Sequence, residues 1–449
     1  MSLSHRGAHF ARPVHTSSVR RLAAAGLLAC ALLGAGGAGT GALATAQTAQ
    51  VEDARRPSHQ AAPSTGDVDA RPGVPSGFSR ASYDPRPVPV VREQTYVRVT
   101  LSAVGDNLMN MPVVTAADAN AGAVGDGLYD FTPMYAGVAD IVAGSDLNFI
   151  DIETILGGDD LGLSGYPVFN SPSAIADQVA GFGWNLATTA TNHSWDMGFA
   201  GIQNSSATWA AHPSVLTTGT FVSPEDRATV RMTERDGIRF AFLAYTDYLN
   251  GYVLPEGQSW AVATADPEAM AADVTSARTQ GADVVIVAMS WGSENATEPN
   301  DGQRLLAQTL ADLGVDVVIG FGPHVIQPVE WVAGLDDAGT PTGHQTLVAY
   351  SLGNFLSNQP LAVENVEGCL TLAFERLGQH GPVSVTNVAW TPLVNHIDGD
   401  YHEVFKLADY PAELARAHDS LGMEADPLGY ARDLTYAVAG STGAARIAL

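Results

Sequence analysis

Cysteine is scarce in this sequence: its 449 residues include only two, Cys30 and Cys369. Cys30 lies in a segment that we interpret below as a targeting sequence, so a mature chain would keep one thiol. One thiol excludes an internal disulfide, and it excludes a metal site built on paired cysteines. Any metal centre in this chain must therefore use carboxylate, amide or imidazole ligands.

Basic residues are also few, with 22 lysines and arginines against 48 aspartates and glutamates, and the formal net charge is −26. The two signs are unevenly distributed. Residues 1–94 hold ten arginines and six acidic residues, whereas residues 95–449 hold 12 basic and 42 acidic residues. A body this acidic lacks the positive footprint that nucleic acids and anionic lipids require. We therefore expect no nucleic-acid partner, and membrane contact only through the N-terminal segment.

The N-terminal segment has the pattern of an export signal. Four arginines precede an uncharged run over residues 22–51, which contains alternative A-x-A cleavage sites at residues 42–44 and 44–46. A basic start, an apolar core and a small-residue cleavage site are typical of a secretory signal peptide. We interpret residues 1–46 as a signal peptide or, because the run is long enough to span a bilayer, as a retained membrane anchor. Leu27–Cys30 also resembles a lipoprotein cleavage box, which leaves lipidation of that cysteine as a third alternative.

Residues 47–94 are rich in alanine, proline, serine and arginine. This composition cannot bury a core, so we expect a disordered linker that would hold the next domain away from a membrane or wall. The main domain, residues 95–410, is then expected to be extracytoplasmic, either secreted or anchored by the N-terminal segment. The last segment, residues 411–449, is expected to be peripheral and helical, without evident chemistry.

From residue 95 onward, short β-rich runs end in small polar clusters and are followed by helical stretches. The predicted strands cover residues 97–104, 147–152, 185–190, 239–246, 283–289, 315–320 and 346–351. Apolar spacing predicts helices over residues 133–144, 171–183, 266–281 and 301–314, three of them with Ser or Asp as the N-cap. This alternation is typical of an α/β fold. Two later strands, residues 369–376 and 383–390, indicate a second, more antiparallel sheet.

The ends of these predicted strands collect side chains that bind metals. The residues are Asp106, Glu153, Asn192, His193 and His324. Ligands of α/β sheets bind outside the carboxyl ends of the strands, and these side chains suit divalent metals such as Mn, Fe, Zn or Mg. Metal ions beside a histidine that protonates the leaving oxygen are the means of metal-assisted phosphoester hydrolysis.

Each candidate also has a structural interpretation. Asp196 lies three residues after His193 and is placed to orient its ring, but it is also placed to cap a helix over residues 198–211. Asp106 has the alternative role of a turn residue, and Glu153 that of an ordinary loop carboxylate. The pair Asn192 and His193 is the stronger signal, because a polar pair after a strand faces the usual ligand side.

Nine short motifs occur in order between residues 96 and 395. They are Val104–Asn107, Tyr129–Met134, Asp146–Leu147 with Glu153–Thr154, Gly165–Pro172, Ala190–Gly198, Ala244–Thr246, Trp291–Glu294, Pro323–Glu330 and Tyr350–Phe355. In this order and spacing they resemble the CapA family of capsule, or poly-γ-glutamate, synthesis proteins. The resemblance implies a calcineurin-like metallophosphoesterase fold, which is an α/β layered sandwich of two mixed β-sheets flanked by helices.

The same resemblance assigns roles to the candidate residues. The implied metal ligands are Asp106, Glu153, Asn192 and His324, for a divalent Mn, Fe or Zn ion. His193 is implied as the proton donor, and we predict Asp196 as its catalytic partner. Asn354, in the last motif, is a candidate accessory residue.

Four positions depart from the family pattern. Ser290 and Gly322 stand where the family has metal-binding histidines, and Thr191 and Asp151 stand where it has asparagines. A hydroxyl is a poor ligand beside imidazole, and glycine offers no side chain. The site is therefore expected to bind metal more weakly, to hold one ion in place of two, or to hold none. Ser290 and Glu294, four residues apart, are candidates for a compensating or accessory role.

Three functions follow from this reading. The first is an extracytoplasmic CapA-like protein for synthesis, export or attachment of an anionic envelope polymer, with weak metal-dependent phosphoester hydrolysis. The second is a non-catalytic binding or assembly subunit on a decayed metallophosphoesterase fold. The third is a general secreted phosphomonoesterase or nucleotidase, which the two missing histidines disfavour. An anionic partner needs either bound cations or a basic patch; the candidate patch is Arg227, Arg231, Arg235 and Arg239.

Overall fold

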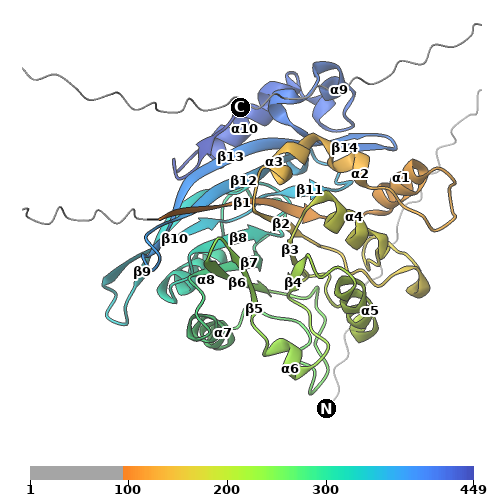
Figure 1. The fold of residues 1–449 in the computed structure, drawn as a ribbon. Coiled ribbons are helices and arrows are strands. Elements are labelled where there is room, and N and C mark those ends of the chain that lie inside the picture. The colour runs from red at the N-terminus through yellow and green to blue at the C-terminus, as the bar shows by residue number, and fades with distance from the viewer. Residues whose placement is uncertain (1–94) are drawn as a thin grey trace, which may run out of the picture. The chain divides into compact units, whose positions relative to one another are not determined.

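The computed structural model describes residues 95–449, and these residues form two mixed β-sheets with helices around them (Figure 1). The predicted α/β fold of two mixed sheets is therefore confirmed. The predicted signal or anchor, residues 1–46, and the predicted linker, residues 47–94, lie outside the described residues. Within residues 95–449, none of the helices is both long enough and apolar enough to cross a bilayer.

The first sheet has the strand order β14-β13-β12-β1-β2-β3-β4, with β11 paired to β1 and β15 paired to β13. Its strands are β1 (Tyr96–Asn107), β2 (Leu147–Asp151), β3 (Leu186–Thr188), β4 (Leu216–Thr218), β11 (Asn354–Leu356), β12 (Val366–Leu377), β13 (Val383–Asp398), β14 (Tyr401–Lys406) and β15 (Arg446–Ile447). Neighbours from β1 to β4 run parallel, whereas β1, β12, β13 and β14 pair antiparallel. The strands predicted at 369–376 and 383–390 therefore extend the first sheet, and the expectation that they form a second, more antiparallel sheet is wrong.

The second sheet has the strand order β5-β6-β7-β8-β10-β9. Its strands are β5 (Arg231–Arg235), β6 (Ile238–Thr246), β7 (Val284–Ser290), β8 (Val317–Phe321), β9 (Val329–Leu335) and β10 (Pro341–Ala349). The four inner strands are parallel and the two edge strands are antiparallel. The parallel strands of each sheet therefore bring their carboxyl ends to one edge, where ligands bind in such sheets.

The helices follow the predicted alternation, with differences at their ends. They are α1 (Met111–Ala121), α2 (Thr132–Tyr135), α3 (Ala139–Ala143), α4 (Ala174–Phe182), α5 (Gly198–Ala210), α6 (Pro224–Arg227), α7 (Pro267–Thr279), α8 (Asp301–Asp312), α9 (Ala412–Ala417) and α10 (Pro427–Val438). The helix predicted over 133–144 is broken by a 3₁₀ turn, Ala136–Val138, which packs against β14.

The predicted helix caps are partly corrected. Asp266 caps α7 as predicted, because its carboxylate accepts from the backbone N–H of Ala269. The cap of α8 is Asn300 and not Asp301. Its side chain accepts from the backbone N–H of Gln303, and the Gln303 side chain accepts from the Asn300 N–H in return. This reciprocal pair satisfies two amide groups that the helix cannot satisfy itself. At α4 no side chain caps the helix.

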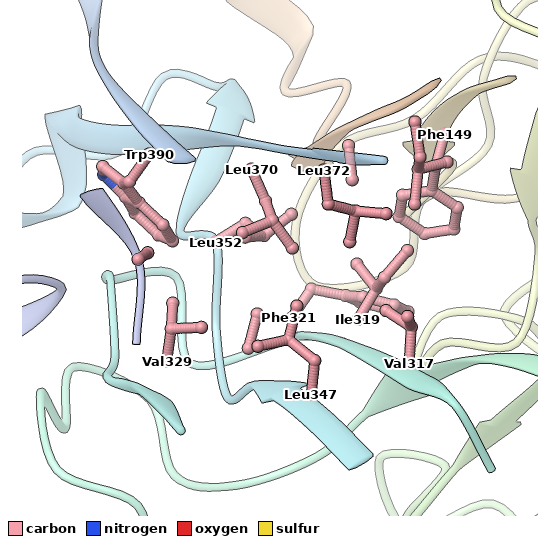
Figure 2. Packing of buried hydrophobic residues seen from close by; sticks show 14 of the residues in the cluster. Phe149, Val317, Ile319, Phe321, Val329, Leu347, Leu352, Leu370, Leu372 and Trp390 are labelled. Carbon is pink, nitrogen blue, oxygen red and sulfur yellow. The ribbon is translucent and has the colours of Figure 1, made fainter. Parts of the chain in front are cut away.

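The main hydrophobic core lies between the two sheets (Figure 2). Phe149 of β2 packs edge-on against Phe242 of β6, with ring centroids 5.9 Å apart, and lies 6.3 Å from the ring of Phe321 in β8. Successive residues of a strand point to opposite faces of the sheet. The residues on the outer face of each sheet are therefore buried under helices. Val113 of α1 packs with the first sheet in this way, and Met270 of α7 packs with the second. This layering leaves the strand ends free to form a site.

The C-terminal segment, residues 411–449, contains α9, α10 and β15. Ala415, Leu421 and Ala431 are buried in the same hydrophobic cluster as the sheets, and β15 pairs with β13 in parallel. The segment is helical as predicted, but it supplies core residues and a strand. The buried residues of this segment are mostly small, and its sequence contains no long apolar run from which burial could be predicted.

Three histidines gather where this segment meets β13 and β14. His396 is fully buried, its Nδ1 lies 2.7 Å from the hydroxyl of Tyr410, and its ring lies 5.6 Å from that of His418. Burial, followed by the positive charges that His418 and His402 can carry, lowers the pKa of His396 to about 4, against the weaker raising effect of two nearby carboxylates. The folded protein therefore disfavours the charged form of this ring.

We expect acid to destabilise the protein through His396. Its pKa is below the 6.5 of the unfolded chain, so this part of the stability is present above pH 6.5 and is lost as the pH falls toward 4. Between pH 7 and pH 5, native protein should lose about 1 kcal/mol more free energy of unfolding than His396→Phe. Urea denaturation of both at the two pH values measures this, with His380→Phe as an exposed control. Equal losses would contradict the prediction.

Candidate metal centre

The end of β1 places Asp106 in the middle of the site because glycine precedes it. An ideal Cβ on Gly105 would lie 1.8 Å from the carbonyl oxygen of Gly353, so no other residue fits without moving the backbone. This close approach brings β11 alongside β1, and the backbone N–H of Asp106 donates to that same oxygen at 3.1 Å. Asp106 is then directly paired with Asn354 in β11 and with Asp151 in β2.

Three carboxylates meet at these strand ends. Asp106, Asp151 and Glu153 are each 0% exposed, and each offers one oxygen within 4.8 Å of the others. Within residues 95–449, neither oxygen of Asp151 and neither oxygen of Glu153 has a hydrogen-bond partner. Burying unpaired carboxylates side by side is costly, and a cation that several of them share removes the cost. The residues present therefore fit a divalent metal ion.

The pKa values of the buried carboxylates and of His324 reflect this unfavourable burial of charge. Burial raises the pKa of Glu153 to about 7, aided by the charge of Asp106. Burial likewise raises the pKa of Asp151 well above its usual range, with Glu153 and Asp106 adding to the effect. For His324, burial lowers the pKa, but the hydrogen bond and charge of Asp106 outweigh it and the net pKa is about 9. In the absence of a cation, protonation of these carboxylates and of His324 reduces the repulsion between the carboxylates.

His324 lies against Asp106 rather than within the carboxylate group. Its Nδ1 donates to Asp106 Oδ2 at 2.8 Å and lies 3.1 Å from Asn354 Oδ1. His324 has a φ of +60°, a left-handed conformation that a residue of this size rarely adopts and that other contacts must hold. Asn354, in turn, donates to the backbone carbonyl of Glu364. Asn354 therefore contacts the His324 ring, and its accessory role stays a prediction.

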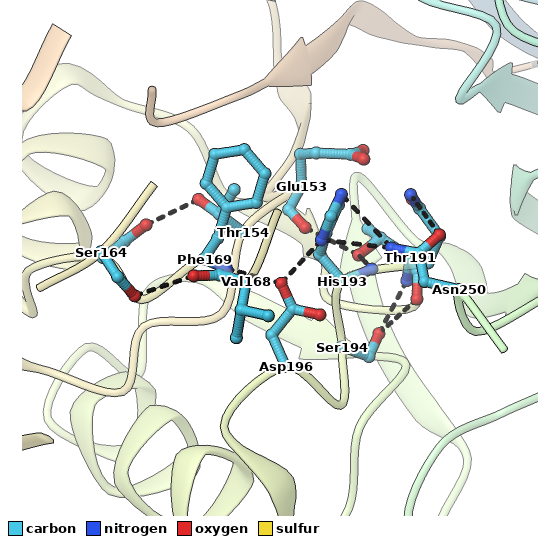
Figure 3. Close-up of polar contacts among 12 residues, drawn as sticks. Glu153, Thr154, Ser164, Val168, Phe169, Thr191, His193, Ser194, Asp196 and Asn250 are labelled. Carbon is cyan, nitrogen blue, oxygen red and sulfur yellow. Dashed lines mark hydrogen bonds and ion pairs between the residues drawn. The ribbon is translucent and has the colours of Figure 1, made fainter. Parts of the chain in front are cut away.

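His193 and Asp196 form a hydrogen-bonded pair next to the carboxylates (Figure 3). His193 Nδ1 donates to Asp196 Oδ2 at 2.7 Å, and the backbone N–H of Phe169 donates to the same oxygen at 2.6 Å. The N-cap of α5 is Met197, without a side-chain cap. Asp196 therefore orients the histidine ring, and it does not cap the helix. Figure 3 shows Asp196 and Asn250 on opposite sides of the ring.

The loop that carries Asn192 is held against the carboxylate group. Thr191 donates its hydroxyl to the backbone carbonyl of Glu153 at 2.7 Å. The Asn192 amide donates to the side-chain oxygen of Asn250 at 3.2 Å. Asn192 is 4% exposed and lines a cavity of about 370 Å³ together with His193 and Glu294.

A second cavity, of about 450 Å³, shares part of that wall and joins the two histidines. His193, His324 and Glu294 all line it. Among the described residues that line it there are two glutamates and no lysine or arginine. Three of the predicted site residues, His193, Glu294 and His324, therefore share one cavity, to which Glu364 adds a second glutamate.

Ser290 and Gly322, the two departures from the family pattern, lie side by side. An ideal Cβ on Gly322 would be 3.4 Å from Ser290 Oγ, and Gly322 has a φ of +100° that side chains rarely tolerate. The backbone N–H of Gly322 points to Asp106 Oδ1 at 3.3 Å. Ser290 is 1% exposed, and its hydroxyl has no partner among the described residues. The positions at which the family pattern has two metal-binding histidines thus offer a hydroxyl and a backbone N–H.

Asp151 is the site residue that sequence reasoning missed. It stands among the departures from the family pattern and not among the predicted ligands. The signal was present, because Asp151 is the one charged residue in the predicted strand 147–152. A charge inside a buried parallel strand needs a partner, and parallel strands are usually apolar throughout.

A comparison with known proteins matches the part of the chain that contains the candidate metal centre. The family model described as "Bacterial capsule synthesis protein PGA_cap" matches residues 100–359. The PGA biosynthesis protein CapA of Bacillus subtilis (strain 168) is 28% identical over 176 residues, which cover 39% of this chain and 43% of that protein. The capsule biosynthesis protein CapA of Bacillus anthracis is 25% identical over 181 residues, 39% of this chain and 41% of that protein. The chain thus matches less than half the length of each relative.

Solved structures with similar folds include a nucleotidase and a calcineurin-like phosphoesterase. The NAD nucleotidase (NadN) of Haemophilus influenzae is 12% identical, with a TM-score of 0.41, over 76% of this chain and 67% of that chain. The calcineurin-like phosphoesterase YfkN of Bacillus subtilis is 13% identical, with a TM-score of 0.41, over 75% of this chain and 100% of that chain. These similarities concern the fold alone.

We expect the metal-free protein to lose stability as Glu153 ionises. Its pKa of about 7 is above the 4.5 of the unfolded chain, so its stabilising contribution is present below pH 4.5 and is lost as the pH rises through 7. In EDTA, native protein should therefore lose about 1–2 kcal/mol relative to Glu153→Gln between pH 5 and pH 8.

Excess Mn²⁺ should then stabilise native protein by about 3 kcal/mol at 100 times the dissociation constant, and the Gln variant by less. Urea denaturation measures the free energy of unfolding of native protein and of Glu153→Gln, each in EDTA and in Mn²⁺, with Asp160→Asn as an exposed control. A native protein that is indifferent to both pH and Mn²⁺ would rule out this account of the carboxylates.

Proposed function

Because this chain belongs to the PGA_cap family of bacterial capsule synthesis proteins, we propose that it acts in the synthesis, export or attachment of an anionic envelope polymer of the poly-γ-glutamate type. The N-terminal sequence supports an extracytoplasmic location, either secreted or membrane-anchored, because it has a basic start, an apolar run and small-residue cleavage sites. The polymer or its synthesis machinery is then the partner.

We further propose weak metal-dependent phosphoester hydrolysis at the candidate metal centre. One observation carries this proposal: two unpartnered buried carboxylates, Asp151 and Glu153, lie with Asp106 beside the His193–Asp196 pair. A divalent ion held there would supply Lewis-acid polarisation of a substrate oxygen. Asp106, Asp151 and Glu153 are the residues that would hold it.

The chain's own groups would bind and protonate the substrate. His193 lines the cavity, and its Nδ1 is held by Asp196, so its Nε2 is the nitrogen that can give a proton to a leaving alkoxide. Asp196 fixes the tautomer and stabilises the charged ring, as a carboxylate behind a catalytic histidine does. Asn250 lies 3.4 Å from His193 Nε2, close enough to position the ring or a bound group.

The alternative, a non-catalytic binding or assembly subunit, also has a specific observation in its favour. Ser290 and Gly322 supply no imidazole where the family pattern has two. Moreover, the φ of +100° at Gly322 shows a backbone arranged for glycine, so the difference is more than one side chain. In this case the carboxylate group would hold a structural cation.

Charge limits how an anionic polymer could bind. The four arginines considered as a basic patch are partly neutralised: Arg227 pairs with Asp273 at 2.7 Å, and Arg231 pairs with Asp226. Two of the four arginines are therefore engaged by acidic side chains, which weakens the proposed basic patch. Because the described residues that line the cavity include His324 but no lysine or arginine, a bound cation would supply the positive charge that an anionic polymer needs, and this favours a metal-dependent mode of binding.

Hydrolysis should depend on His193 and on added metal. We expect the full chain with Mn²⁺ to hydrolyse a generic phosphoester, and His193→Ala to lower kcat about 100-fold or more, which is the usual contribution of a general acid. Asp196→Asn should also lower kcat and should change its pH dependence, because the ring would lose its orienting carboxylate.

Steady-state assays with Mn²⁺, Zn²⁺ and Fe²⁺ measure this, and His380→Ala serves as the control because His380 is exposed. No turnover with any of these metals, in a chain that does bind metal, would favour the non-catalytic alternative.

The envelope role needs a test in the cell. Deleting the gene in its host should reduce or alter the surface polymer, measured by the amount and chain length of extractable polymer. A gene copy carrying His193→Ala separates the two functions: restoration of the polymer shows an assembly role, and failure to restore it shows that the chemistry is required. Unchanged polymer in the deletion strain would contradict the envelope role.

A further inference from the structure

We propose that the candidate metal centre holds one divalent cation, not two, and that Asp151 is a third carboxylate ligand beside Asp106 and Glu153. The cation is of the class that prefers oxygen ligands, represented here by Mn²⁺. This inference rests on the metal site of the proposed function, but it concerns the ligands and the number of ions. It holds whether or not the site hydrolyses a substrate.

The strand geometry makes Asp151 a ligand. Asp151 is directly opposite Asp106 where β1 and β2 pair in parallel, and both side chains are fully buried. Glu153 follows two residues later, and the chain between them is fixed by the Ile152 N–H, which donates to the Thr188 carbonyl at 3.0 Å. Fixed backbones on both strands hold the three carboxylates together at 4.8 Å or less.

The unpartnered oxygens of the three carboxylates indicate a shared cation. Four carboxylate oxygens, two on Asp151 and two on Glu153, have no hydrogen-bond partner within the part of the chain that the structure describes. An asparagine at position 151 would place a neutral amide where the chain has a charge. The aspartate instead increases the negative charge of the group, which costs stability unless the charge is used for binding.

The donor atoms select the class of cation. The three clustered side chains offer oxygen alone, while Nδ1 of His324, the imidazole that contacts Asp106, is engaged by Asp106 and Asn354. Carboxylate oxygens suit Mn²⁺, Mg²⁺ and Ca²⁺, whereas imidazole-rich sites suit zinc. Replacing histidines by Ser290 and Gly322 while gaining Asp151 moves the ligand set in this direction.

The structure also limits the number of ions to one. A second ion would need ligands on the side of Ser290 and Gly322. An ideal Cβ on Gly322 would meet the backbone carbonyl and N–H of Trp291 and the Ser290 hydroxyl, which include no carboxylate and no imidazole, and the N–H of Gly322 itself is directed at Asp106. An N–H donor repels a cation, and the φ of +100° prevents a side chain from replacing it without strain.

The test measures Mn²⁺ binding to the metal-free full chain by titration calorimetry and by electron paramagnetic resonance. We expect one Mn²⁺ per chain and the spectrum of an isolated ion, without the exchange coupling of a pair. Asp151→Asn should weaken Mn²⁺ binding at least about tenfold, because fewer charged ligands lower the affinity of such sites. Asp160→Asn, an exposed carboxylate exchange of the same kind, should bind as native protein does.

Two ions per chain with a coupled spectrum would overturn the inference, and so would an Asp151→Asn variant that binds Mn²⁺ as tightly as native protein. Thermal unfolding of the variant in EDTA shows whether it folds, and the ion count on native protein does not depend on any variant. Turnover with two bound ions would reject this inference alone. One Asp151-dependent ion without turnover would reject the hydrolytic proposal alone.

Discussion

The burial of three like charges at the ends of two adjacent strands is the constraint on which the site depends. Asp106, Asp151 and Glu153 cannot separate, because the pairing of β1 with β2 fixes their backbones. Each neighbouring feature can be understood as a response to this charge. His324 gains a proton and a strained backbone beside Asp106, and Gly322 turns its N–H toward the same carboxylate. Positive groups are gathered where the carboxylates would otherwise repel one another.

Glycine makes this crowding possible at two places. At Gly105, the absence of a side chain lets β11 approach β1 and brings Asn354 to His324. At Gly322, it permits a left-handed turn between β8 and His324. The first glycine builds the carboxylate side of the site. The second stands where the family pattern has a metal-binding histidine, and its φ of +100° is a conformation that side chains rarely adopt, which is why we propose one ion and not two.

Much of this arrangement could be predicted from the sequence, because strand ends are easy to find. Alternating apolar runs gave the strands, and the polar residues that follow them gave Asp106, Glu153, His193 and His324. Asp151 is harder to predict because it lies inside a strand, where its role depends on its neighbour across the sheet and not on its own sequence context. Strand pairing is a long-range property, and a single strand's pattern does not contain it.

The competing roles of Asp196 show the same limit. Its spacing from His193 and its place before a helix fitted two interpretations, and local pattern could not choose between them. The choice is made by Phe169, whose backbone N–H donates to Asp196 from a loop distant in sequence. Likewise, the C-terminal segment joined the core through small residues such as Ala415 and Ala431, whose burial depends on how closely the sheets approach.

Charge connects the site to the rest of the protein. The described body carries a large negative excess, and the cavity walls add Glu294 and Glu364. One divalent ion does not neutralise three carboxylates, and the positive charge of His324 brings the group only close to neutrality. Such a centre does not attract a polyanion from a distance, because attraction of that kind needs a net opposite charge. A polymer segment would have to bind through direct contact with the ion and the cavity wall, so recognition would be local, short-range and sensitive to the cation present.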